Sequence, residues 1–148
     1  MRIPITVVRV RDQDSALAFY RDTLGFTVTE DMDIGPMRWL TVSPPDQPEL
    51  NVLLERLGPP MIDEETQEHL DALLAKGVGS SLFLQVDDCR ATFDELVAKG
   101  VEVIDEPKER FYGIDCGVRD DSGNPIRINQ PAKTGIAPPA ESKVGNAY

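Results

Sequence analysis

The sequence predicts an α+β fold built from two tandem β-α-β-β-β modules, with the helices outside the sheets. First, a length of 148 residues suits one compact domain or two small modules that share a core. Second, a hydrophobic content of 41% is sufficient for that core. Third, a shift of 76 residues (86 − 10, from Val10 to Val86) brings two halves into register, with apolar, acidic and glycine positions in the same order.

The first module is predicted over residues 1–55. It begins with a strand over residues 3–10, which is rich in β-branched residues. Asp12 or Asp14 then supplies a side chain suited to the N-cap of a helix, and Gly25 stands where a left-handed residue ends it. The spacing i, i+3, i+7 gives this helix one apolar stripe, formed by Leu17, Tyr20 and Leu24.

Three further strands complete this module, at residues 27–30, 38–43 and 49–55. The proline-rich cluster over residues 44–48 lies between the last two strands and predicts a turn. The order of elements is therefore β-α-β-β-β.

Residues 56–80 are predicted to form a helical linker. Gly58-Pro59-Pro60 breaks regular structure, and Asp63-Glu64-Glu65 places acidic residues in the first turn of a helix that ends at Gly77. The buried face of this helix is expected to consist of Leu70, Leu73 and Leu74.

The second module is predicted over residues 81–131. A strand over residues 81–86 leads to the N-cap residue Asp88 and to a helix that ends at Gly100. The apolar stripe of this helix is Phe93, Leu96 and Val97, and the remaining strands are expected at residues 102–105, 115–119 and 126–130. Residues 132–148 form a C-terminal tail whose composition is typical of disorder, with docking on the body or on a partner chain as the alternative.

Charge and cysteine content exclude several functions. The net charge of −11 (15 − 26) argues against nucleic acid and anionic membranes as partners, because both would repel the chain. The short apolar runs predict no membrane span and no signal peptide, and the two cysteines, Cys89 and Cys116, are interpreted as reduced thiols of a cytoplasmic protein. His69 is the only histidine, so one chain cannot form a multi-histidine metal site.

The duplicated module resembles the vicinal oxygen chelate superfamily, in its glyoxalase I, bleomycin resistance protein and extradiol dioxygenase branch. The matching segments are Val10-Arg11-Asp12 followed by Ala16 to Phe26, Val86-Asp87-Asp88 with Lys99-Gly100-Val101, and Asp121-Ser122-Gly123-Asn124-Pro125-Ile126. The resemblance covers residues 3–131. It implies that the sheet of each module curls into a cup-shaped half-barrel with its helix outside, and that the protein forms a homodimer.

The residues at the metal-binding positions of this family do not suit a metal. The resemblance places those positions at Ile5 and Ser81 in the first strand of each module, and at Asn51 and Arg127 in the last strand. A divalent cation needs three or four imidazole, thiolate or carboxylate donors. Ile5 has no donor atom and Arg127 is a permanent cation, so we expect neither a metal nor another cofactor.

Strand alternation predicts which side chains line the cup. Alternate residues of a strand share a face. In the first and last strands of each module, one set of alternate residues is almost wholly apolar, as packing on helices requires. The other set of alternate residues mixes polar and apolar side chains, as a small-molecule pocket does. The predicted ligand-binding residues are Arg9, Trp39, Asn51, Ser81, Phe83, Gln85, Arg127 and Asn129.

These residues leave alternatives open. The two arginines would favour an anionic or carbonyl-bearing ligand, but acidic neighbours could instead pair with them. Trp39 could stack on a planar ligand, and a core or dimer contact is the other interpretation.

Three functions follow from this site. The first is metal-independent binding and sequestration of a small organic molecule, as in bleomycin resistance proteins. The second is a metal-independent lyase or isomerase whose acid or base is Glu49, Glu55, Tyr112 or Asp115. The third is a structural or regulatory module with a vestigial cup. A divalent-metal glyoxalase or dioxygenase is expected less than any of these.

Overall fold

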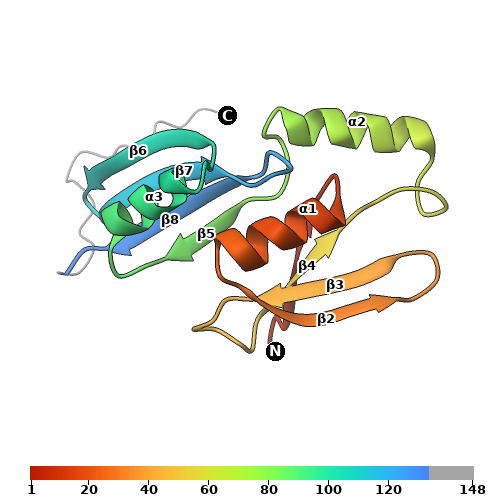
Figure 1. The fold of residues 1–148 in the computed structure, drawn as a ribbon, viewed down its shortest axis with the longest axis horizontal. Helices are drawn as coiled ribbons and strands as arrows, with labels where there is room; N and C mark the ends of the chain where they lie inside the picture. The colour runs from red at the N-terminus through yellow and green to blue at the C-terminus, as the bar shows by residue number, and fades with distance from the viewer. Residues whose placement is uncertain (134–148) are drawn as a thin grey trace.

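The computed structural model describes residues 1–133 and confirms the predicted fold class. Two four-stranded mixed sheets, ordered β1-β4-β3-β2 and β5-β8-β7-β6, lie side by side, each with a helix packed against it (Figure 1). In both sheets the first strand pairs in parallel with the last, and the other pairs are antiparallel. The prediction about docking of the tail falls almost wholly on residues 134–148, which lie outside the described residues.

The first module has the predicted order of elements: β1 Ile5–Arg9, α1 Gln13–Ala18, a π-helical turn η1 Phe19–Thr23, β2 Thr27–Asp33, β3 Arg38–Ser43 and β4 Asn51–Glu55. Of the two candidate N-caps, Asp12 takes the position, and its carboxylate accepts a 2.8 Å hydrogen bond from the backbone N–H of Ser15. β2 runs to Asp33, beyond its predicted end at residue 30, because it pairs along the whole length of β3.

The linker contains the predicted helix, α2 Glu64–Ala75, with Asp63 as its N-cap. Its expected buried face is only partly correct, because Leu74 is buried whereas 44% of Leu73 is exposed. Figure 1 shows the reason, since α2 lies apart from both sheets and has no sheet face to pack against along its length.

The second module repeats the first: β5 Leu82–Gln85, α3 Cys89–Ala98, β6 Val103–Arg110, β7 Gly113–Arg119 and β8 Pro125–Pro131. Leu96 is buried as predicted, but 45% of Val97 is exposed, so the stripe of α3 is narrower than expected. The three helix-ending glycines, Gly25, Gly77 and Gly100, have φ of 77°, 78° and 80°, in the left-handed region that the sequence predicts for Gly25 and Gly100.

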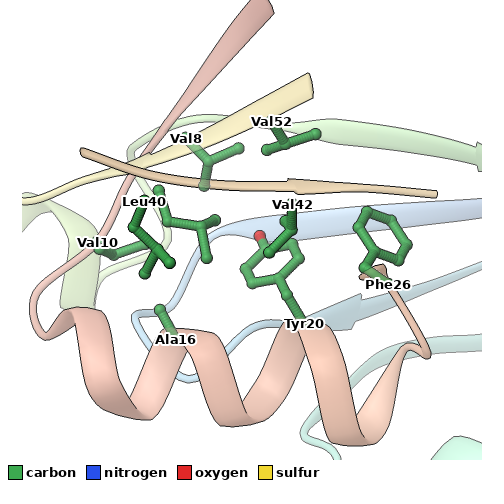
Figure 2. Close-up of a cluster of buried hydrophobic side chains, with 9 residues drawn as sticks. Val8, Val10, Ala16, Tyr20, Phe26, Leu40, Val42 and Val52 are labelled. Carbon is green, nitrogen blue, oxygen red and sulfur yellow. The ribbon is translucent and has the colours of Figure 1, made fainter. Parts of the chain in front are cut away.

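Each module has its own core between its sheet and its helix. In the first, Ala16 and Tyr20 of the helix face Val8, Val10, Leu40 and Val42 of the sheet (Figure 2). In the second, Cys89 and Leu96 pack on Cys116, Val118, Ile126 and Ile128. The first and last strands therefore turn the predicted set of apolar residues toward the helices. The opposite faces of the sheets are free to form the site.

The repeat is less regular than one shift of 76 residues. Val42 pairs with Val52, and Val118 pairs with Ile126, so β3 and β7 differ by 76 residues (118 − 42) whereas β4 and β8 differ by 74 (126 − 52). The structural equivalent of Arg127 is therefore Leu53, not Asn51. A change of two residues keeps the side chain on the same face of its strand, so the predicted faces are unaffected.

The turn between β7 and β8 ties the two modules together. The Asp120 carboxylate accepts a 3.0 Å hydrogen bond from the hydroxyl of Tyr20 in the first module, and both groups are buried. The Asn124 amide donates to the carbonyl of Arg9 at 2.7 Å, and the Ser122 hydroxyl accepts from the backbone N–H of Arg11 at 3.0 Å. These contacts fix one module against the other.

Candidate functional site

An open cavity of about 470 Å³ lies on the concave face of the second module. Four of the predicted ligand-binding residues line it, and they form two lateral pairs, Phe83 beside Arg127 and Gln85 beside Asn129. The other lining residues are Leu84, Tyr112, Asp115 and Pro131. The alternation of β5 and β8 thus assembles a pocket from two neighbouring strands.

Arg127 forms the polar floor of this cavity. Its guanidinium donates to Asp105 of β6 at 2.5 Å and also to Asp115 of β7. To reach Asp105, the side chain crosses β7 at Gly117, where an added Cβ would lie only 2.7 Å from the guanidinium. Glycine at this position therefore makes room for the ion pair.

Both members of the Arg127–Asp115 pair are charged at neutral pH. Burial disfavours the charged carboxylate, but hydrogen bonds from Arg127 and Tyr112 hold the pKa of Asp115 below its ordinary value. Burial likewise disfavours the guanidinium, and its bonds to Asp105 and Asp115 nevertheless raise the pKa of Arg127. Because carboxylates already pair with Arg127, the expectation that it attracts an anionic ligand is not supported.

Aromatic rings form the walls of the cavity. Phe83 is 78% exposed, although an apolar ring of this size is normally buried. Tyr112, in the turn between β6 and β7, lies edge to face with Phe111 at a centroid distance of 5.1 Å. Burial, together with the hydrogen bond to Asp115, raises the pKa of Tyr112, so its hydroxyl stays protonated. Two rings and two amides, those of Gln85 and Asn129, are thus presented to the cavity.

The structure does not bring the other four predicted residues into this cavity. Arg9 forms an ion pair with Glu55 on the concave face of the first module. In the same module, the Trp39 indole N–H donates to Glu30 at 2.8 Å, and the Asn51 side-chain carbonyl accepts from Thr29 at 2.8 Å. Ser81 is exposed just before β5 and does not line the cavity.

Tyr112 and Asp115 were predicted only as acid or base candidates, not as ligand contacts. The signal that identifies Asp115 is the pairing of β7 with β8, in which Asp115 lies directly beside Asn129. The alternation argument applied to the first and last strands alone therefore missed it. Glu55 is occupied by Arg9, and Glu49 lies away from this cavity.

The residues at the family's metal positions do not fit a divalent cation. The corrected register replaces Asn51 with Leu53, so the four side chains are an isoleucine, a leucine, a serine and an arginine. These four side chains include no imidazole, thiolate or carboxylate. Within residues 1–133, no group of three or more His, Cys, Asp or Glu side chains is placed to hold a metal ion.

Comparisons with known proteins agree on one family. The model of the Glyoxalase/Bleomycin resistance protein/Dioxygenase superfamily matches residues 2–128. The "Uncharacterized protein YurT" of Bacillus subtilis (strain 168) is 36% identical over 88% of this chain and 99% of its own length.

Two solved structures are also similar. The crystal structure of UcmS2 has 47% sequence identity and a TM-score of 0.83, over 87% of this chain and 97% of that one. TnmS3, described as an antibiotic binding protein from Streptomyces sp. CB03234, has 30% identity and a TM-score of 0.70, over 89% and 97%. Among the helices of residues 1–133, none has the length and apolar character to cross a membrane.

Proposed function

The chain belongs to the Glyoxalase/Bleomycin resistance protein/Dioxygenase superfamily, and we propose that it binds and sequesters a small planar aromatic molecule on the concave face of its second module. The observation that carries this proposal is the exposed ring of Phe83, which stands beside fixed polar groups in a cavity of about 470 Å³. A mostly apolar wall with a few placed polar groups is typical of small-molecule sites. The similarity to the antibiotic binding protein TnmS3 supports an antibiotic as the ligand.

This binding is proposed to be independent of metal. The support is the chemistry of the side chains at the family's metal positions, where Arg127 stands in place of a carboxylate and is itself held by Asp105 and Asp115. A cation at that position would meet the charge of the guanidinium.

The alternative function, a metal-independent lyase or isomerase, has one candidate base in the cavity. Asp115 is only 6% exposed and lines the site, as such a base would. However, its lowered pKa and its bond to Arg127 make it a weak proton acceptor, since a general base works best with a pKa near the working pH. Sequestration is therefore the function that we put forward.

A titration with a panel of planar aromatic antibiotics tests the site. We expect the full-length protein to bind at least one of them, and Tyr112→Leu to weaken its affinity about tenfold, because one aromatic wall is lost. Isothermal titration calorimetry measures the affinity, and dialysis against a chelator is expected to leave it unchanged.

The control is Leu73→Ala, which truncates an exposed apolar side chain of α2 that does not line the cavity. This variant should bind as the unmodified protein does. Equal losses in both variants, or binding that disappears with the chelator, would contradict the proposal.

We also propose that the protein is a cytoplasmic homodimer. The concave face of the first module is open in the single chain, with Val7 39% exposed, and a second copy would cover it. Light scattering of the purified protein is expected to give twice the chain mass of 16.4 kDa, and a monomer mass would reject the dimer. The free, buried thiols of Cys89 and Cys116 support the cytoplasmic location.

A further inference from the structure

A second cavity, of about 700 Å³, lies between the two modules. The turn between β3 and β4 and the end of the first helix form one side of it, and β5 and α3 form the other. We call it the inter-module cleft. β5 separates it from the concave cavity, and Phe83, Leu84 and Gln85 line both.

The inter-module cleft has an apolar floor contributed by both modules. Leu24 and Phe26 come from the first, and Leu84 and Leu96 from the second. Leu96 and Phe26 are buried, whereas Leu24 and Leu84 are half-buried and so retain surface for a ligand. An apolar body of moderate size is therefore the part of a ligand that this floor would accept.

Three carboxylates stand around that floor. Asp46 and Glu49 belong to the turn between β3 and β4, and Glu95 belongs to α3. All three are exposed, and none of them forms an ion pair within residues 1–133. The carboxylates that line the concave face differ in this respect, because Asp115 and Glu55 both have arginine partners.

The unpaired edge of β5 adds hydrogen-bonding groups to the same cleft. β5 is the edge strand of its sheet, and the Val86 backbone N–H donates to Asn129 of β8 at 2.9 Å. Because backbone groups alternate sides along a strand, those of Phe83 and Gln85 point away from β8. They supply donors and acceptors at the wall of the cleft.

From this combination we propose that the inter-module cleft binds a cationic amphiphile, that is, a compound with an apolar body and a protonated amine. The body lies on the accessible surface of Leu24 and Leu84, and the ammonium group is held among Asp46, Glu49 and Glu95. The net charge of −11 favours the approach of such a cation. This site shares Phe83, Leu84 and Gln85 with the concave cavity, but it differs in its three carboxylates and in the charge that it selects.

The probe for this site is 9-aminoacridine, a fluorescent planar amine that is cationic at neutral pH. We expect the full-length protein to quench it saturably at low salt, and to bind it more weakly as salt rises. The double variant Glu49→Gln, Glu95→Gln removes two charges without changing side-chain size, and should weaken binding about tenfold. In the Tyr112→Leu background, which weakens the concave site, uncharged acridine at the same pH should bind about as weakly as the probe binds to the double variant.

The control variant is Glu65→Gln, Glu68→Gln, which removes the same net charge from the exposed surface of α2. It should bind the probe as the unmodified protein does. Tyr112→Leu should also keep this binding, so loss of the concave site and loss of the cleft site are distinguishable. Equal weakening in the two double variants, or no binding of the probe, would overturn the proposal. An oligomeric state that changes in the Glu49→Gln, Glu95→Gln variant would also overturn it, because the two carboxylates would then serve subunit contact.

Discussion

Replacing Asp120 with alanine is expected to lower the free energy of unfolding by about 4 kcal/mol, because each unsatisfied buried donor costs on the order of 1 kcal/mol or more. The Asp120 carboxylate accepts from the Tyr20 hydroxyl, from the backbone N–H groups of Ser122 and Asn124, and from the Asn124 side-chain amide. Alanine would leave four donors without this acceptor. Urea denaturation measures the loss, and a thermal scan should show a fall of about 10 °C.

Asp87→Ala is the control, because this aspartate is exposed in a loop of the same module. Its effect should be within about 0.5 kcal/mol. Tyr20→Phe removes a single donor and should lie between the two. If Asp120→Ala unfolds with the same free energy as Asp87→Ala, the modules do not depend on this turn for their arrangement.

The order of elements could be predicted because each has a local signal. Alternation identified the first and last strands, and the Asp caps and the three glycines fixed the ends of the helices. The lengths of β2 and β6 could not be predicted in this way. β6 extends to Arg110 through a charged stretch that contains Pro107, because β7 pairs with it and the register shifts at that point to accommodate the interruption.

The candidate site was predictable to the extent that it depends on alternation within strands. Phe83, Gln85, Arg127 and Asn129 were found because they share one face of two paired strands. The ionic partners of Arg127 were not found, since Asp105 lies 22 residues away and reaches it only across Gly117. Strand register decides such contacts, and a register is a property of pairing rather than of either strand alone.

The eight predicted ligand-binding residues are divided between two sheets, and this division also depends on how elements pack rather than on any single strand. An internal repeat makes equivalent residues of two modules look like one site, but it does not say how the modules are placed. Here the contacts of the turn over residues 120–124 with Arg9, Arg11 and Tyr20 set that placement. Trp39 and Asn51 consequently lie on a concave face other than the one that holds Arg127.

Replacing Arg127 with methionine is expected to destabilise the protein by about 2 kcal/mol at pH 7, because two half-buried or buried carboxylates lose their shared cation. Arg21→Met is the control, since Arg21 pairs with Asp22 on the exposed surface, and it should leave the stability unchanged within error. Urea denaturation at pH 7 compares the two variants with the unmodified protein.

The pH dependence of this loss identifies its cause. In the unmodified protein the pKa of Asp115 lies below its unfolded value of about 3.9, so the stability from this group is present above that pH and is lost only as pH falls further. Without Arg127, Asp115 keeps the longer 3.4 Å pair with Arg110, but burial and the neighbouring Asp105 should outweigh it and raise the folded pKa of Asp115 above its unfolded value. The variant then gains stability as pH falls through that raised value, so the deficit should shrink between pH 7 and about pH 4. A deficit that stays constant over this interval would mean that Arg127 contributes by packing over Gly117 rather than by its charge.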